Sequence, residues 1–124
     1  MNLTRAEEYI KSQARIFLLE MRAFYPFGCA IDDKNNLRPL SAYIEGENPS
    51  PVELIDLLEG NIVQKIEIGE YVMGIVAIDV TISNENVKQD AIEMRIFIKD
   101  EKTVKKHLIY KMTEGDIEFW ESPN

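Results

Sequence analysis

The sequence predicts a single α+β domain over residues 1–124, with two helices packed on a five-stranded antiparallel sheet. In two segments the apolar residues recur at spacings of three and four, which is the period of an amphipathic helix. From residue 71 onward they alternate with polar residues, which is the period of a strand. The expected element order is α-β-β-α-β-β-β, and the expected strand order is 2-1-5-4-3.

The first helix is expected over residues 4–24. Thr4 and Glu7 have the spacing of a capping box, in which each side chain bonds the backbone amide of the other residue. Pro26 ends the helix, because the residue before a proline is disfavoured in the helical conformation. The apolar stripe consists of Leu3, Ala6, Ile10, Ala14, Phe17, Met21 and Phe24.

A β-hairpin is expected next, with strands at Phe27–Ile31 and Leu37–Ile44. The segment Asp32–Asn36 between them is rich in turn-forming residues. Pro39 cannot donate a hydrogen bond to a neighbouring strand, so its strand is expected at an edge of the sheet. Gly28 is expected to permit a backbone conformation that a side chain would resist.

Ser50, Pro51 and Glu53 predict the start of a second helix, as cap, first helical residue and capping-box partner. Gly69 is placed to end this helix in the left-handed conformation. Gly60 predicts a kink or a close contact with the sheet. The expected buried stripe consists of Val52, Ile55, Leu58, Ile62 and Ile66.

Three strands are expected after residue 70, and the first is apolar on both faces over Tyr71–Ile78. We therefore expect cover on both sides of the sheet at that point. A three-residue loop at 100–102 would place Ile98 opposite Val104 and His107 opposite Arg95 in the last two strands. The acidic tail 114–124 contains aromatic residues and is expected to dock on the domain.

The element order resembles that of roadblock and profilin-like folds, although the third helix of roadblock proteins has no counterpart here. The segment Phe24–Gly28, with the sequence Phe-Tyr-Pro-Phe-Gly, resembles a motif that follows the first helix in a family of small bacterial proteins. The turn at 32–36 and the Asp-Ala-Ile sequence at 90–92 resemble later parts of the same family. The resemblance implies no activity, but some members look like partners in bacterial toxin–immunity systems.

The formal net charge of −8 disfavours nucleic acid as a partner, because phosphate backbones repel an acidic protein. No apolar run reaches the ~18 residues of a membrane span. The N-terminus lacks the pattern of a signal peptide, and the single cysteine, Cys29, excludes an internal disulfide. A cytoplasmic location is therefore expected, with no membrane association.

Few residues suggest chemistry. The only histidine, His107, has no further metal ligands near it in sequence, so neither a metal site nor a cofactor is expected. Cys29 is expected to be a buried apolar residue rather than a nucleophile. Asp79 lies between apolar residues and is expected either to face water or to receive a helix cap. A lysine-rich strip could bind an anion or form a solvated strand face; its members are Lys99, Lys102, Lys105, Lys106 and Lys111.

The favoured function is that of a non-enzymatic protein-binding domain, with a basic partner or a second copy of itself. Tyr25 is the expected anchor, since an exposed tyrosine beside other aromatic residues suits an interface. The acidic residues expected to steer a basic partner, such as a nuclease toxin, are Glu45, Glu47, Glu53, Asp56 and Glu59.

Two other functions remain open. The chain could be a small-molecule sensor or enzyme with a pocket between helix and sheet, or a structural subunit of a larger assembly. The residues that could line such a pocket are Tyr43, Tyr71, Tyr110 and Trp120.

Overall fold

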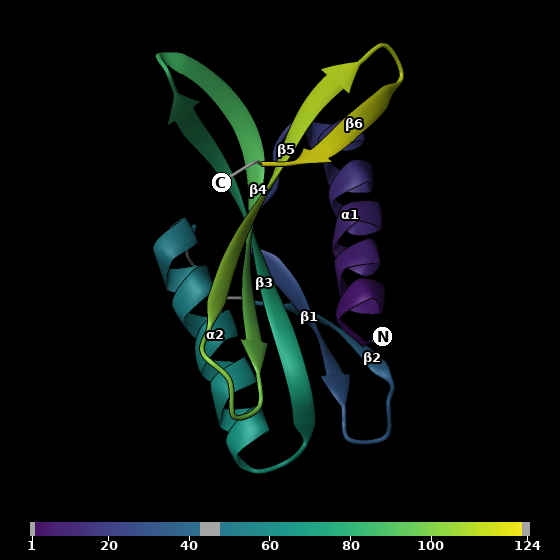
Figure 1. Cartoon of the computed structure of the whole chain (residues 1–124), viewed down its shortest axis with the longest axis vertical. Helices are drawn as coiled ribbons and strands as arrows, with labels where there is room; N and C mark the ends of the chain where they lie inside the picture. Colours follow the sequence, from purple (N-terminus) through teal and green to yellow (C-terminus); the bar gives the residue numbers. More distant parts are fainter. Residues whose placement is uncertain (1, 43–47, 123–124) are drawn as a thin grey trace.

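The computed structural model describes residues 2–42 and 48–122. These contain two helices, α1 (Asn2–Met21) and α2 (Pro51–Glu67). The strands are β1 (Phe27–Asp32), β2 (Leu37–Ser41), β3 (Tyr71–Asn84), β4 (Val87–Ile98), β5 (Val104–Thr113) and β6 (Asp116–Glu121). They form one antiparallel sheet in the order β2-β1-β3-β4-β5-β6, with a helix on each face (Figure 1).

The α+β class with two helices on an antiparallel sheet is confirmed, but the predicted strand number and strand order are wrong. The sheet has six strands, because the segment expected only to dock forms β6 after a tight turn with Gly115 at φ 84°. β1 pairs with β3 rather than with the last strand. Ile75 and Val76 are both fully buried although they point to opposite faces. A strand covered on both faces belongs inside a sheet, which explains why β3 is central and not at an edge.

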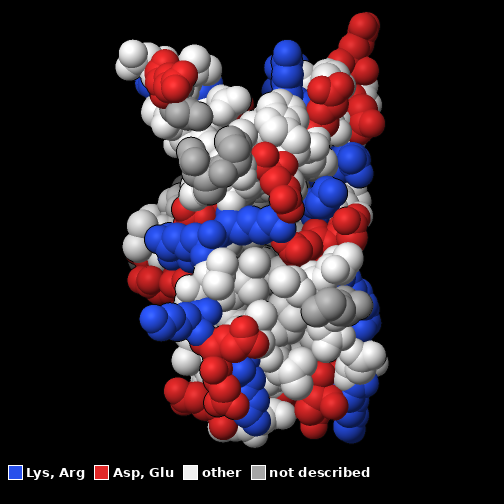
Figure 2. All heavy atoms as spheres, viewed as in Figure 1, with Lys and Arg blue, Asp and Glu red and all other residues white. Residues whose placement is uncertain are grey.

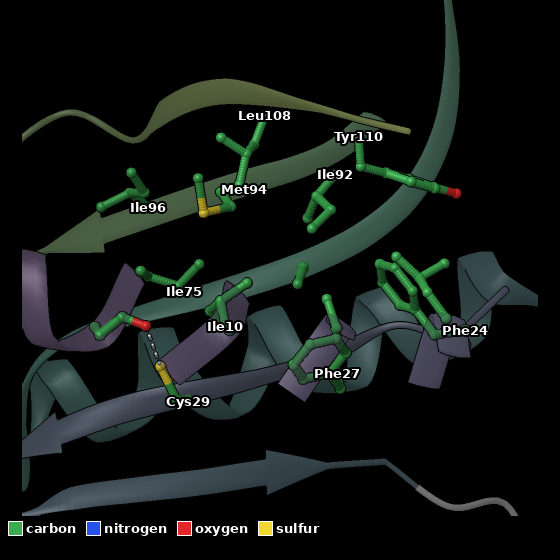
Figure 3. Close-up of a cluster of buried hydrophobic side chains, with 14 of the residues drawn as sticks. Ile10, Phe24, Phe27, Cys29, Ile75, Ile92, Met94, Ile96, Leu108 and Tyr110 are labelled. Atoms are coloured by element: carbon green, nitrogen blue, oxygen red, sulfur yellow. Dashed lines mark hydrogen bonds between the residues drawn. The ribbon is translucent and has the colours of Figure 1, made fainter. Parts of the chain in front are cut away.

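Helix α1 buries Ala6, Ile10, Ala14 and Leu18 against the larger of two hydrophobic clusters (Figure 3). The helix already includes Asn2, so Thr4 lies inside it and the predicted capping box is wrong. The remaining members of the cluster come mainly from alternate positions of the strands that face α1; among them are Cys29, Ile31, Met73, Ile75, Ala77, Ile92, Met94, Ile96, Leu108, Tyr110 and Ile117.

Helix α2 begins and ends as the sequence predicts. The Ser50 hydroxyl accepts a hydrogen bond from the Glu53 amide at 3.3 Å, and Gly69 has a φ of 81° beyond the last turn. Its buried side is Leu54, Leu58 and Ile62, so the predicted stripe is right in its centre, while Val52 is 65% exposed.

Two of three interior glycines lie where neighbouring elements approach closely. A Cβ on Gly28 would lie 2.3 Å from the Ile75 carbonyl oxygen, so Gly28 is required by the narrow gap between β1 and β3 rather than by an unusual φ. A Cβ on Gly74 would lie 2.7 Å from Ile62 of α2. A Cβ on Gly60 would meet nothing within 4 Å, so the close contact predicted as one possibility there is wrong.

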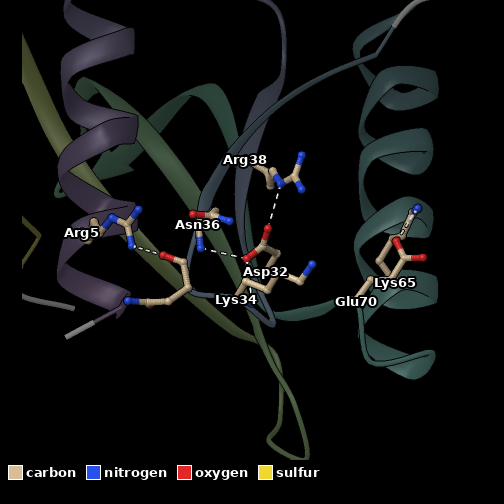
Figure 4. A network of polar contacts seen from close by, with 8 residues as sticks. Arg5, Asp32, Lys34, Asn36, Arg38, Lys65 and Glu70 are labelled. Carbon is tan, nitrogen blue, oxygen red and sulfur yellow. Dashed lines mark hydrogen bonds and ion pairs between the residues drawn. The ribbon is translucent and has the colours of Figure 1, made fainter.

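The proline-bearing strand β2 lies at an edge, as predicted. In the turn before it, the buried carboxylate of Asp32 accepts hydrogen bonds from the amides of Lys34 and Asn36 and from the Arg38 guanidinium (Figure 4). The three distances are 2.9, 2.8 and 2.9 Å. This side chain, rather than backbone pairing alone, holds the tight turn.

The β4–β5 register differs from the prediction by two residues. Ile96 lies opposite Val104, and His107 lies opposite Glu93 rather than Arg95. The assignment of side chains to faces is right, because a shift of two residues keeps every side chain on its own face. The neighbour of His107 is nevertheless a carboxylate instead of a cation.

The sheet divides at one end. β4 and β5 pair only up to Ala91 and Ile109, after which the β3–β4 hairpin and the β5–β6 hairpin diverge (Figure 1). Figure 2 shows the resulting notch between the two hairpin tips. We refer to this opening, bounded by residues 87–90 of β4 and 110–113 of β5, as the fork.

Candidate partner-binding surface

An apolar groove of about 340 Å³ lies between the end of α1 and the start of α2. Met21 and Tyr25 are each 62% exposed there. An exposed aromatic side chain beside an apolar groove is typical of an anchor for a protein partner. The side chains that line this Tyr25 groove are Met21, Ala23, Phe24, Tyr25 and Pro51.

The packing of its neighbours directs Tyr25 outward. The rings of Phe24 and Phe27 lie edge to face at 5.3 Å, and both contact Phe17 of α1. The Phe24 amide donates to the Asp79 carboxylate at 3.4 Å, which attaches this segment to β3. With Phe24 and Pro26 both buried, the residue between them is left at the surface.

The sequence predicted Tyr25 but missed the other residues of the groove. Met21 has the spacing of the buried stripe, yet it is the last residue of α1 and its side chain is exposed. Pro51 was interpreted only as a helix start. Both residues lie at predicted helix ends, and that position is the feature of the sequence that could have identified them.

The predicted acidic residues divide into three groups. Glu53 and Asp56 are exposed near the start of α2, and neither has an ion-pair partner within residues 2–42 and 48–122. Glu59 is half-buried and lies 3.4 Å from Arg95, so this carboxylate already has an ion-pair partner within the chain. Glu45 and Glu47 lie outside the described residues. Of the predicted acidic residues that the structure describes, Glu53 and Asp56 are therefore the two that are exposed and unpaired on the helix whose Pro51 lines the groove.

A polar cluster surrounds His107 on the face of the sheet that α2 covers in part. The Glu93 carboxylate lies 3.0 Å from His107 Nε2 and accepts a hydrogen bond from Arg95 Nε at 2.8 Å. Burial raises the pKa of Glu93, but the hydrogen bonds from Arg95 and His107 lower it by more, so the carboxylate stays ionised. Because both of its oxygens have partners, Glu93 serves as a link in an ion-pair network rather than as a free base.

The lysine strip does not gather on one face. Lys106 points toward α1, where its ammonium contacts Glu7 at 2.9 Å and Glu121 at 2.7 Å. Lys105 follows the opposite face, across from Arg95. Alternation along β5 thus separates neighbouring lysines, and an anion site along the whole strip does not form.

Cys29 is fully buried, and burial raises the pKa of its thiol to about 12. The thiol donates a weak hydrogen bond to the Ala6 carbonyl at 3.7 Å (Figure 3). A thiol of this kind is a packing group, because the nucleophile in cysteine chemistry is the thiolate.

The three described side chains proposed for a small-molecule pocket do not line one pocket between helix and sheet. Tyr110 and Trp120 line a surface pocket of about 410 Å³ in the fork. Tyr71 lines a separate pocket beside α2 and β2, and Tyr43 lies outside the described residues.

No group of three His, Cys, Asp or Glu side chains within residues 2–42 and 48–122 could hold a metal ion. Neither helix is long and apolar enough to cross a membrane. No family model, curated protein or solved structure matches the chain.

Proposed function

We propose that this chain is a protein-binding domain that takes an apolar side chain of its partner into the Tyr25 groove. The observation that carries the proposal is the groove itself, since two of its five lining side chains, Met21 and Tyr25, are 62% exposed. Groups this apolar are costly to leave in water, and a partner that covers them gains affinity from the burial.

The charge beside the groove defines the kind of partner. Glu53 and Asp56 lie within the first turns of the helix whose Pro51 lines the groove. In a chain with a net charge of −8, these carboxylates favour a basic partner and increase its rate of association. A nuclease toxin has such a surface, so a toxin–immunity pair is the specific form of this proposal.

Photo-crosslinking tests the groove directly. A chain with benzoylphenylalanine in place of Tyr25 is expected to crosslink one basic protein in the native host. The matched control carries the same group in place of Ile68, which is 61% exposed but lies at the other end of α2. Equal crosslinking from both positions would count against the groove.

Affinity measurements with the captured protein then separate the apolar and charged contributions. Tyr25→Ala is expected to weaken binding by at least tenfold, while Ile68→Ala changes it by less than about twofold. Glu53→Lys with Asp56→Lys is expected to slow association and reduce its salt dependence. Glu101→Lys with Glu114→Lys, two exposed charge reversals in the β4–β5 and β5–β6 turns, is the control with the same net charge.

A further inference from the structure

Two strand edges in the fork have no neighbouring strand. β4 pairs with β3 from Val87 onward, and β5 pairs with β6 as far as Thr113. The two strands pair with each other only up to Ala91 and Ile109. In the described part of the chain, the edges that face the fork therefore lack a partner strand at residues 87–90 and 110–113. Backbone hydrogen-bonding groups on such an edge are a template for the addition of another strand.

The other free edges are protected against pairing with a second copy. β2 carries Pro39, which lacks a backbone donor. The edge strand β6 carries the exposed Glu118, which has no ion-pair partner among the described residues and would lie close to its own copy in a β6–β6 pair centred on this strand.

The β4 edge differs, because Lys88 and Asp90 carry opposite charges at alternate positions. Both side chains are exposed, and neither has an ion-pair partner among the described residues. They lie on the same face of the sheet, since alternate residues of a strand share a face. The burial of Ile92 against α1 identifies that face.

We propose that two copies of this chain dimerise by antiparallel pairing of residues 88–90 of β4 around a twofold axis at Gln89. In that register Lys88 lies opposite the partner's Asp90, and Asp90 lies opposite the partner's Lys88. A twofold interface repeats each contact, so the strand edge is complementary to itself. Opposite charges directly across an antiparallel pair stabilise it, and like charges destabilise it.

The surroundings of this edge fit a second strand. The pocket of about 410 Å³ in the fork is lined by residues of both arms, so the β4 edge is accessible from the open side.

Charge reversal tests the register. Sedimentation equilibrium is expected to show a dimer of the full chain. Lys88→Glu and Asp90→Lys, each alone, place like charges opposite each other twice per dimer and are expected to weaken association about tenfold. The double variant restores both pairs and is expected to return to within about threefold of the original. A chain that is monomeric at all concentrations, or single variants that dimerise normally, would overturn the proposal.

Disulfide trapping locates the twofold axis. Gln89→Cys would place two thiols directly opposite each other, where Cβ atoms lie about 4.5–5.5 Å apart and can be oxidised to a disulfide with little movement. The native Cys29 is fully buried and does not compete. Ser83→Cys, which lies exposed on the same hairpin, is the matched control. A covalent dimer from Gln89→Cys alone supports the register, whereas equal dimer from both variants, or none from Gln89→Cys, contradicts it.

The dimer and the Tyr25 groove are tested independently. A monomeric chain would remove the β4 interface but leave the predicted effects of Tyr25→Ala on partner binding unchanged. Conversely, loss of the groove's function would not alter the charge-swap result.

Discussion

Asp32, in the turn between β1 and β2, and Asp79, below the fork, are both carboxylates held within the fold, yet their pKa values shift in opposite directions. The backbone hydrogen bond from Asn36, with further bonds from Arg38 and Lys34, lowers the pKa of Asp32 to about 2 (Figure 4). Burial raises the pKa of Asp79, and its hydrogen bonds from Tyr110 and Phe24 only partly offset this.

The difference lies in the donors. Asp32 has two backbone amides on one oxygen and a guanidinium on the other, all within 2.9 Å. Asp79 has the neutral Tyr110 hydroxyl at 2.7 Å and a long bond from the Phe24 amide at 3.4 Å, and nearby Asp90 adds repulsion. A carboxylate taken from water is thus stabilised only where enough donors, including a cation, replace its hydration.

The two sites make opposite contributions to stability as the pH changes. The folded pKa of Asp32 lies below the unfolded value of about 3.9, so its contribution is present at neutral pH and is lost as the pH falls toward about 2. The folded pKa of Asp79 lies above that unfolded value. Its contribution is therefore present below about pH 4 and is lost as the pH rises through its folded pKa.

Removal of the Asp32 carboxylate gives the largest expected effect. Asp32→Ala leaves the amides of Lys34 and Asn36 without their side-chain acceptor and frees Arg38 from its partner. In urea denaturation at pH 7, this variant is expected to lose more unfolding free energy than Tyr110→Phe or Asp79→Asn. The difference from the original chain should shrink toward pH 2. Asp33→Ala, at the exposed next position, is the control, and an equal loss there would contradict this account.

Removal of one donor from Asp79 gives the next largest effect. Tyr110→Phe deletes the 2.7 Å bond and leaves the carboxylate with the long Phe24 contact alone. We expect a loss of about 1–2 kcal/mol of unfolding free energy at pH 7, and a smaller loss at pH 4 where Asp79 is more protonated.

The control for this substitution is Tyr71→Phe, because the Tyr71 hydroxyl has no hydrogen bond among the described residues. It should change the unfolding free energy by less than about 0.5 kcal/mol. Equal losses from the two substitutions would show that the Tyr110 hydroxyl does not stabilise the fold through Asp79.

The sequence predicted those structural features that depend on residues close together in the chain, and it failed for features that depend on the whole sheet. The ends of α2 and the edge position of β2 follow from Ser50, Gly69 and Pro39, whose effects act on adjacent backbone. The strand order was wrong because hydrogen-bond partners are chosen by burial across the whole sheet. The apolar residues on both faces of β3 predicted cover on both sides, and the same observation implies a central strand.

The candidate sites follow the same rule. Tyr25 was found because Pro26 and its aromatic neighbours mark a break in the helix, whereas Pro51 joins the groove only through the tertiary fold. Neither outcome predicted for Asp79 is right: the side chain is half-buried and accepts hydrogen bonds from the Tyr110 hydroxyl and from the Phe24 amide, which lies beyond the end of α1. The two-residue turn Glu114–Gly115 was the local signal for β6 that the prediction overlooked.

The smallest expected effect comes from making the Asp79 side chain neutral. Asp79→Asn keeps an oxygen that can accept from Tyr110 and removes both the cost of a poorly solvated charge and the repulsion from Asp90. These gains oppose the loss of the Phe24 contact, so we expect the unfolding free energy to change by less than about 1 kcal/mol at pH 7.

The decisive measurement is the unfolding free energy from pH 4 to pH 7. It is made at one protein concentration, because association of the chain would shift the unfolding free energy. The original chain loses the Asp79 contribution over this range and the variant does not, so the variant should gain stability relative to the original chain as the pH rises. A difference that stays constant with pH would mean that Asp79 titrates as an ordinary surface carboxylate. Of the two carboxylates, only Asp32 would then have a pKa shifted by the fold.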